Sequence, residues 1–429
     1  MGDTSRPNFI VIMTDDQRYD SMDAMPITTA RLGGSGITFT HAYLTTPLCC
    51  PSRTSFYSGL YVHNTNIWRN EIGYDIFHKR FDNDSIGPWM QQAGYRTGVF
   101  GKYLNLYNVK HTPPGWDQWF TIADGRYFEY SANDNGKVRR FEKKADQYST
   151  DVIKRKAIEF INTSEKPFFL VIAPQAPHGD HDGPDEDKAG EAIPAPRHRP
   201  CPEITPYRPP SFNEDDVSDK PKWIQKKRKV SEKTIDAFHK AQKCSLLAVD
   251  ELVGEVLDAL EAKGVRENTM VVYYSDNGYM YGEHKLVKKN CTYEACARTP
   301  FIVSYPALAP QGVTSDAMIS HIDITATILD FAGVTPSREI NGKSFRSVLE
   351  DPQTTVRDAV LVEVHNNFTD KRDYSIRTPE YRYTELGTGG KELYDMVNDP
   401  WELENIDTNL DYAVAIQNLS VKLAELKAE

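Results

Sequence analysis

The sequence lacks long apolar runs, a surplus of positive charge and any dense group of cysteines. No stretch approaches the roughly 18 consecutive apolar residues that a membrane-spanning helix needs. The opening residues also lack the charged segment and longer apolar segment of a signal peptide. We therefore expect no membrane span, and a cytoplasmic location unless a leader has been removed.

The charge balance excludes whole classes of partner. The 429 residues carry a formal net charge of −11 at pH 7, and the pI is about 5.6. Nucleic acids and membrane surfaces are anionic, so a general binder of either is normally basic. We expect no nucleic-acid partner, and any anionic ligand must be attracted by local positive charge.

The six cysteines are too sparse for a disulfide framework in a chain of this length. No Cys/His spacing matches a zinc site, and one bridge can be drawn, for example between Cys291 and Cys296. Two cysteines stand out because they are adjacent: Cys49 and Cys50 come directly before Pro-Ser-Arg. A free cysteine is usually a small buried hydrophobe, so the pair alone has an ordinary explanation.

The order of apolar patterns predicts an α/β fold. Short runs rich in β-branched residues predict buried strands at 8–14, 96–101, 167–173, 269–275 and 300–305. Helical patterns lie between them, at 85–93, 149–162 and 231–263. We expect a mostly parallel sheet between helices, with the binding site outside the carboxyl ends of its strands.

The length favours two packed units. We expect a catalytic α/β domain over 1–339 and a smaller α+β subdomain over 340–429, with strands at 360–364, 374–377 and 381–385 and a helix from near Asp411. Two insertions, 106–148 and 174–222, interrupt the first domain. The first insertion contains a hairpin signal around 133–136, and the second is a long loop rich in proline and charge.

Polar side chains follow the predicted strands where each strand ends. Taken singly, each is most often a cap, a turn or a surface residue. Their shared placement instead favours a common site, and three carboxylates with an amide require a cation. An all-oxygen set suits a hard divalent ion such as Ca²⁺ or Mg²⁺. The polar residues that follow the strands are Asp15, Asp16, Lys102, His178, Asp276 and Asn277, and the oxygen donors among them are the three aspartates and the asparagine.

The segment from Cys49 to Arg53 matches the Cys-x-Pro-Ser-Arg signature of type I sulfatases, members of the alkaline phosphatase superfamily. The resemblance covers most of the chain, through IVIMTDDQR, GYRTGVFGKY, FFLVIAPQAPH, YYSDNGYMYGEH and YEACARTPFIV. It implies that Cys49 is oxidised to formylglycine by a formylglycine-generating enzyme. Cys50 would merely fill the variable position.

The same resemblance implies a role for each site residue. It implies that the metal ligands are Asp15, Asp16, Cys49, Asp276 and Asn277. It implies that the catalytic residues are Cys49, Arg53, Lys102, His178 and Lys289, with His178 as the general acid on the leaving oxygen. Substrate binding falls to Lys102, His178, Lys289 and a further candidate, His284.

The chemistry gives a reason for converting a cysteine. A hydrated aldehyde has two hydroxyls on one carbon, so one attacks sulfur and the other later expels sulfate. Many sulfatases place a histidine in Gly-Lys-x-His to assist this hydrate, but Leu104 stands there in this chain. The variant GKYLN is similar to the branch of glucosamine-6-sulfatases and heparan sulfate 6-endosulfatases, and Lys102 or Asn105 would hold the hydrate instead.

The leading prediction is a sulfatase that acts on a sulfated sugar resembling 6-O-sulfated glucosamine, and on aryl sulfates. The acidic stretch 178–188 is unlike what a long polyanion would need, which keeps a small saccharide open as the substrate. Two alternatives remain at this stage. One is a phosphodiesterase or phosphonate monoester hydrolase of the same superfamily, and the other is a carbohydrate-binding pseudoenzyme.

Overall fold

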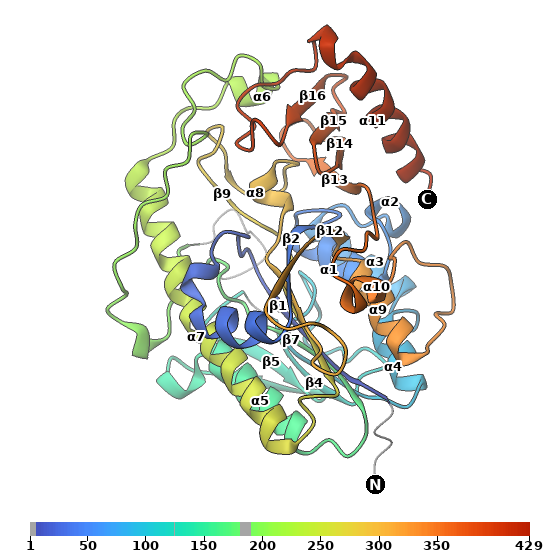
Figure 1. Ribbon diagram of the computed structural model, residues 1–429. Coiled ribbons are helices and arrows are strands. Elements are labelled where there is room, and N and C mark those ends of the chain that lie inside the picture. Colours follow the sequence, from blue (N-terminus) through green and yellow to red (C-terminus); the bar gives the residue numbers. More distant parts are fainter. Residues whose placement is uncertain (1–5, 124, 181–189) are drawn as a thin grey trace.

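The computed structural model describes residues 6–123, 125–180 and 190–429 (Figure 1). A large central sheet runs through the molecule and contains ten strands, in the order β12-β2-β11-β8-β1-β7-β3-β4-β5-β6. Their bounds are β1 (Asn8–Thr14), β2 (Ile37–Tyr43), β3 (Arg96–Lys102), β4 (Gln118–Ile122), β5 (Ser131–Asp134), β6 (Lys137–Arg140), β7 (Phe168–Ala173), β8 (Thr269–Ser275), β11 (Phe301–Ser304) and β12 (Val313–Ser320). A separate ribbon joins β9 (Met280–Tyr281) and β10 (Val287–Lys288).

The centre of the sheet is parallel, as predicted. β1 pairs in parallel with β7 and with β8, and β3 pairs in parallel with β7 and with β4. Strands buried on both faces read as continuous apolar runs, which is why these segments were recognisable in the sequence. Antiparallel pairs occur where β11 inserts between β2 and β8, and at the edge formed by β4, β5 and β6.

Helices cover both faces of the sheet (Figure 1). The helices are α1 (Cys49–Ser58), α2 (Val62–Thr65), α3 (Asn70–Arg80), α4 (Ile86–Gln92), α5 (Ser149–Asn162), α6 (Lys222–Gln225), α7 (Glu232–Lys263), α8 (Glu294–Ala297), α9 (Asp323–Ala332), α10 (Arg346–Glu350) and α11 (Ala413–Leu426). Alternate side chains of β1 enter different cores. Phe9, Val11 and Met13 pack with residues of α1, α3, α4 and α9, whereas Ile10 and Ile12 pack with residues of α5 and α7.

The C-terminal part forms a four-stranded antiparallel sheet, β13-β14-β15-β16, which α11 covers. Its strands are β13 (Val360–Asn366), β14 (Lys371–Arg377), β15 (Tyr381–Glu385) and β16 (Lys391–Asp395). Leu419 and Leu423 of α11 share a core with Ile376 and Tyr383 of the sheet and with Tyr61 from the larger part. The two parts therefore pack directly on each other.

The five strands and three helices predicted for the larger part are confirmed, within one or two residues at their ends. The hairpin around 133–136 is β5 and β6. Six strands were missed: β2, β4, β9, β10, β12 and β16. β2 and β12 mix polar and apolar residues and lie at one side of the sheet, where burial is incomplete and the sequence signal is weaker.

Two disulfides join cysteines in the described residues. Cys291 pairs with Cys296, as the sequence allowed, and Cys201 pairs with Cys244 of α7. The second pair is 43 residues apart in the chain and was not predicted, since only the packing of a long loop on α7 brings it together. Among the described residues, no helix is both long and apolar enough to cross a membrane.

Candidate active site

The predicted polar residues converge because their strands are neighbours. β8, β1, β7 and β3 lie side by side in that order, all parallel. Their carboxyl ends therefore present Asp276, Asp15, His178 and Lys102 along one edge of the sheet. All four side chains are buried. The structure thus brings these strand ends together, as the sequence led us to expect, and the roles of the four side chains stay a prediction.

Local backbone geometry fixes two of these positions. Asp16 has a φ of 67°, an uncommon conformation for a residue with a side chain, and its N–H donates to Asp276 Oδ1 at 3.3 Å. Gly101, with a φ of 118°, directly precedes Lys102. A Cβ at this glycine would lie 2.0 Å from the carbonyl oxygen of Ala173. Only glycine lets β3 approach β7 this closely just before the lysine.

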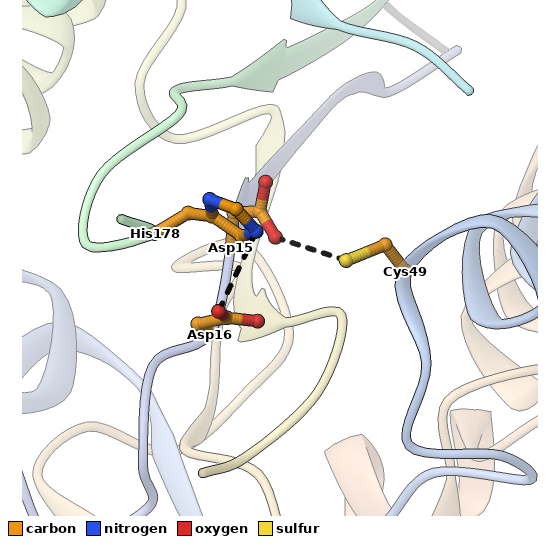
Figure 2. A group of neighbouring side chains, drawn as sticks. All are labelled: Asp15, Asp16, Cys49 and His178. Atoms are coloured by element: carbon orange, nitrogen blue, oxygen red, sulfur yellow. Dashed lines mark hydrogen bonds and ion pairs between the residues drawn. The ribbon is translucent and has the colours of Figure 1, made fainter. Parts of the chain in front are cut away.

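Cys49 is the first residue of α1, and the start of that helix faces the carboxylates (Figure 2). Its Sγ lies 3.4 Å from Asp15 Oδ1. His178 lies on the other side of the group, with Nε2 3.7 Å from Asp16 Oδ2. Ligand atoms of these four residues all lie within 4.8 Å of one another.

A histidine that sequence reasoning missed holds the start of α1. The buried His321 accepts the N–H of Thr45 at Nδ1 (3.2 Å), and its Nε2 donates to the carbonyl oxygen of Ser52 (3.0 Å). Burial lowers the pKa of His321 to about 4, so the ring is neutral and carries its proton on Nε2. A single histidine after a strand gives no sequence signal of this role.

Cys50 differs from its neighbour. Its side chain is fully buried against α3, where a Cβ on Gly73 would lie 2.2 Å from Cys50 Sγ. Burial raises the pKa of the Cys50 thiol to about 12. The thiol therefore stays protonated and packs as a small apolar group, which fits the prediction that Cys50 fills a variable position.

Three cations surround the carboxylates. Lys102 Nζ lies 2.6 Å from Asp15 Oδ2, and Arg53 Nε donates to Asp276 Oδ2 at 2.7 Å. Lys289, which follows the β9–β10 ribbon, contacts both Asp16 Oδ1 (2.6 Å) and Cys49 Sγ (2.8 Å). Three positive side chains thus gather at one place in an acidic protein, each paired with one of the three carboxylates.

Burial and neighbouring charges shift the pKa values of Asp15 and Asp276 in opposite directions. Burial alone would raise the pKa of Asp15, but Lys102, His178, Arg53 and Lys289 together hold it well below its usual range. Burial, and then the charge of Asp15, raise the pKa of Asp276 above its usual range. The positive side chains therefore stabilise the ionised form of Asp15 more fully than that of Asp276.

The residues fit a hard divalent cation. Asn277 Nδ2 donates to Asp16 Oδ1 at 2.5 Å, but its Oδ1 is buried without a hydrogen-bond donor among the described residues. A buried acceptor without a donor is costly, and a cation would satisfy it. Together with the carboxylates of Asp15, Asp16 and Asp276, this oxygen offers a donor set typical of Ca²⁺ or Mg²⁺ sites.

Two further positions remain to be placed. Leu104 is buried in the apolar core, so it offers no polar group where many sulfatases have a histidine. His284 packs on the ring of Tyr293, and its Nδ1 lies 2.6 Å from Glu214 Oε2. Burial lowers the pKa of His284 to about 3. Its role in substrate binding stays a prediction.

The acidic stretch 178–188 falls largely outside the described residues.

Comparison with known proteins gives a family. The Sulfatase family profile matches residues 7–334, and the profile described as N-sulphoglucosamine sulphohydrolase, C-terminal, matches residues 282–429. A Caenorhabditis elegans extracellular sulfatase Sulf-1 homolog is 36% identical over 358 residues, which are 79% of this chain and 48% of that protein. The chain thus spans about half the length of that relative. Human N-acetylglucosamine-6-sulfatase is 32% identical over 387 residues, 84% of this chain and 67% of the human one.

Solved structures agree with this family. One protein, solved in complex with its substrate D-glucosamine-2-N,6-O-disulfate, superposes with a TM-score of 0.86 and 26% identity, covering 99% of this chain and 98% of its own. The phosphonate monoester hydrolase of Agrobacterium radiobacter gives a TM-score of 0.75 at 18% identity, covering 99% and 96% of the two chains. The second likeness concerns the fold alone.

Proposed function

The chain belongs to the sulfatase family, and on that premise we propose that it hydrolyses the sulfate ester of a sulfated saccharide. The observation that carries the proposal is the position of Cys49. Its Sγ lies 3.4 Å from a carboxylate oxygen of Asp15 and 2.8 Å from the ammonium nitrogen of Lys289. The signature cysteine therefore faces both the cation-binding carboxylates and a group that binds sulfate.

We assign one divalent cation to the acidic residues, Ca²⁺ before Mg²⁺. When bound, such an ion polarises the attacking oxygen and neutralises charge on the sulfate. Ca²⁺ is favoured because several carboxylates and an amide oxygen surround one point, which suits its high and flexible coordination number. The residues that would hold it are Asp15, Asp16, Cys49, Asp276 and Asn277.

We also propose that a formylglycine-generating enzyme converts Cys49 to formylglycine. The modified residue supplies a hydrated aldehyde, with one hydroxyl to attack sulfur and a second to expel sulfate. Cys49 has no exposed surface in the folded chain. The converting enzyme must therefore reach this segment before folding is complete.

The remaining polar side chains divide between charge and proton transfer. Arg53, Lys102 and Lys289 stabilise the negative charge on the transferring sulfuryl group. His178 Nδ1 donates to the carbonyl oxygen of Gly179 at 2.7 Å, which keeps a proton on that nitrogen. Its Nε2 is the nitrogen on the side of Asp16, so in the imidazolium form, which carries a second proton there, this atom is the one that would protonate the leaving oxygen.

The group that holds the hydrate in place of the usual histidine is a separate question. Leu104 cannot do so because it has no polar atom and is buried in the core. Lys102 is the stronger candidate, since its Nζ is 2.6 Å from the same carboxylate that Cys49 approaches. Asn105 is the second. Substituting each and following sulfate release separately from ester cleavage distinguishes them.

For the substrate we propose 6-O-sulfated glucosamine and its N-substituted forms. The support is the similarity to a human N-acetylglucosamine-6-sulfatase and to a solved protein that binds a glucosamine 2-N,6-O-disulfate. Small aryl sulfates would serve as artificial substrates. Whether the enzyme attacks chain ends or internal positions is an outcome of assays on oligosaccharides of increasing length.

The deciding experiment joins mass spectrometry with an activity assay. Protein produced with a formylglycine-generating enzyme is digested, and the peptide that contains Cys49 is weighed; an aldehyde at this position is expected. Activity on an aryl sulfate should be present in this protein and absent in Cys49→Ala. Faster hydrolysis of the matching aryl phosphate or phosphonate would favour the phosphorus-ester alternative. An unmodified thiol despite competent machinery would favour a carbohydrate-binding pseudoenzyme.

A further inference from the structure

A second cluster of metal-ligating side chains lies away from Cys49, where the end of α3 meets the segment between β3 and β4. It consists of His78, Asp82 and His111. His78 Nδ1 lies 2.5 Å from Asp82 Oδ2, and His111 Nε2 lies 2.8 Å from the same oxygen. The three ligand atoms all lie within 4.8 Å of one another.

The surroundings hold both imidazoles in position. The ring of His78 stacks on Tyr74, with centroids 5.7 Å apart and planes 9° from parallel. The backbone of His111 is fixed because its carbonyl oxygen accepts from Tyr107 Oη and from Asn133 Nδ2, and its N–H donates to Asn108. The two imidazole centroids are only 4.3 Å apart. Preorganised ligands of this kind reduce the entropic cost of binding.

One oxygen of the Asp82 carboxylate has no hydrogen-bond partner among the described residues. Its side chain is about 5% exposed, so the carboxylate is almost completely buried. Oδ2 carries both histidine contacts, whereas Oδ1 has no hydrogen-bond partner among the described residues. A buried carboxylate oxygen without a donor is unfavourable, and a cation beside it removes the deficit.

We propose that His78, Asp82 and His111 bind a Zn²⁺ ion, separate from the cation of the active site. Zn²⁺ takes histidine nitrogen and carboxylate oxygen at about 2.0–2.2 Å, with water in the remaining position. Each neutral imidazole binds through the nitrogen that now donates to Asp82, and its proton moves to the other ring nitrogen.

The donor types separate this site from the catalytic one. Two imidazoles and a single carboxylate suit Zn²⁺ and other first-row divalent ions, whereas Ca²⁺ and Mg²⁺ favour oxygen ligands. The sequence did not reveal the site because it uses no cysteine and joins a helix end to a residue about 30 positions later. A bound ion would tie the segment 103–117 to α3, and this segment starts directly after Lys102.

The test measures Zn²⁺ binding in a Cys49→Ala background, with excess Ca²⁺ present to fill the catalytic carboxylates. Zinc chloride is titrated against a chromophoric chelator that reports free Zn²⁺. His78→Asn and His111→Ala are compared with Lys79→Ala and Lys110→Ala, which change the neighbouring exposed residues. Circular dichroism checks that each variant is folded. If His111→Ala does not fold, His78→Asn decides, because this side chain is 44% exposed.

We expect the parent and both lysine variants to bind one equivalent of Zn²⁺. Both histidine variants should bind it at least about tenfold more weakly, since even the loss of an outer hydrogen bond reduces metal affinity about 10- to 100-fold. Equal binding in all the variants, or no binding in the parent, would overturn the proposal. The three residues would then be a hydrogen-bonded His-Asp-His cluster. Neither outcome affects the sulfatase proposal, because that is tested at Cys49.

Discussion

Glu294 joins the C-terminal sheet to the active-site side of the molecule, and its substitution should destabilise the protein in a pH-dependent way. It is the first residue of α8 and is buried. Its carboxylate lies 3.1 Å from Arg377 Nε on β14 and accepts from Tyr43 Oη of β2 at 2.9 Å. Burial alone would raise the pKa of Glu294, but Arg377, Arg298 and Arg382 lower it to about 2.

The size and sign of the effect follow from linkage. The pKa falls from 4.5 to about 2, a shift of about 2.5, and each unit corresponds to about 1.4 kcal/mol. The ionised carboxylate therefore contributes ~3 kcal/mol to the free energy of unfolding at neutral pH. Because the folded pKa is depressed, the contribution is complete above the unfolded pKa and is lost as the pH falls from about 4.5 towards 2. At pH 3.5 it should have fallen to ~2 kcal/mol.

The assay is denaturant unfolding of the wild type and of Glu294→Gln at pH 7, 5 and 3.5. Gln keeps the shape but cannot ionise, so the variant should be less stable by ~3 kcal/mol at pH 7 and at pH 5, and by less at pH 3.5. Glu203→Gln, at an exposed site, is the matched control and should change little at any pH. An equal deficit for Glu294→Gln at all three pH values would refute the ionic explanation and leave a packing effect.

Substitutions at three other places should also have measurable effects. Lys289→Met should lower kcat on an aryl sulfate about 10²- to 10³-fold, because a positive group that contacts the nucleophile position is lost. A decrease in kcat of less than tenfold would show that Lys289 is not a catalytic residue. Gly73→Ala should destabilise the protein by ~2 kcal/mol in denaturant unfolding, since its Cβ would meet Cys50 Sγ at 2.2 Å; unchanged stability would contradict this packing. Cys201→Ser and Cys244→Ser should each lower the free energy of unfolding by ~4 kcal/mol, because each opens a loop of 43 residues. If the difference in stability between wild type and variant persists in reductant, the disulfide is not its cause.

The sequence by itself determined the buried parallel strands at the centre of the sheet and which polar side chains follow them. β1, β7 and β8 are buried on both faces, and such strands must be continuous apolar runs, so their positions were readable. The rule that parallel strands end at one edge then placed Asp15, His178 and Asp276 together without any coordinates. The signature from Cys49 to Arg53 indicated the position of the nucleophile, and it was recognisable because its five residues are consecutive in the chain.

Tertiary structure alone decided which distant groups touch. Lys289 meets Asp16 although 273 positions separate them, and Cys201 meets Cys244 because a long loop packs on α7. His321 is fixed against the start of α1 by contacts that no local pattern encodes. These contacts depend on how loops and helices pack around the sheet, and packing is set by shape and burial over the whole chain. The sequence pattern records only which segments are apolar, so it determines the buried central strands and leaves the less buried strands and the side-chain partners to the fold.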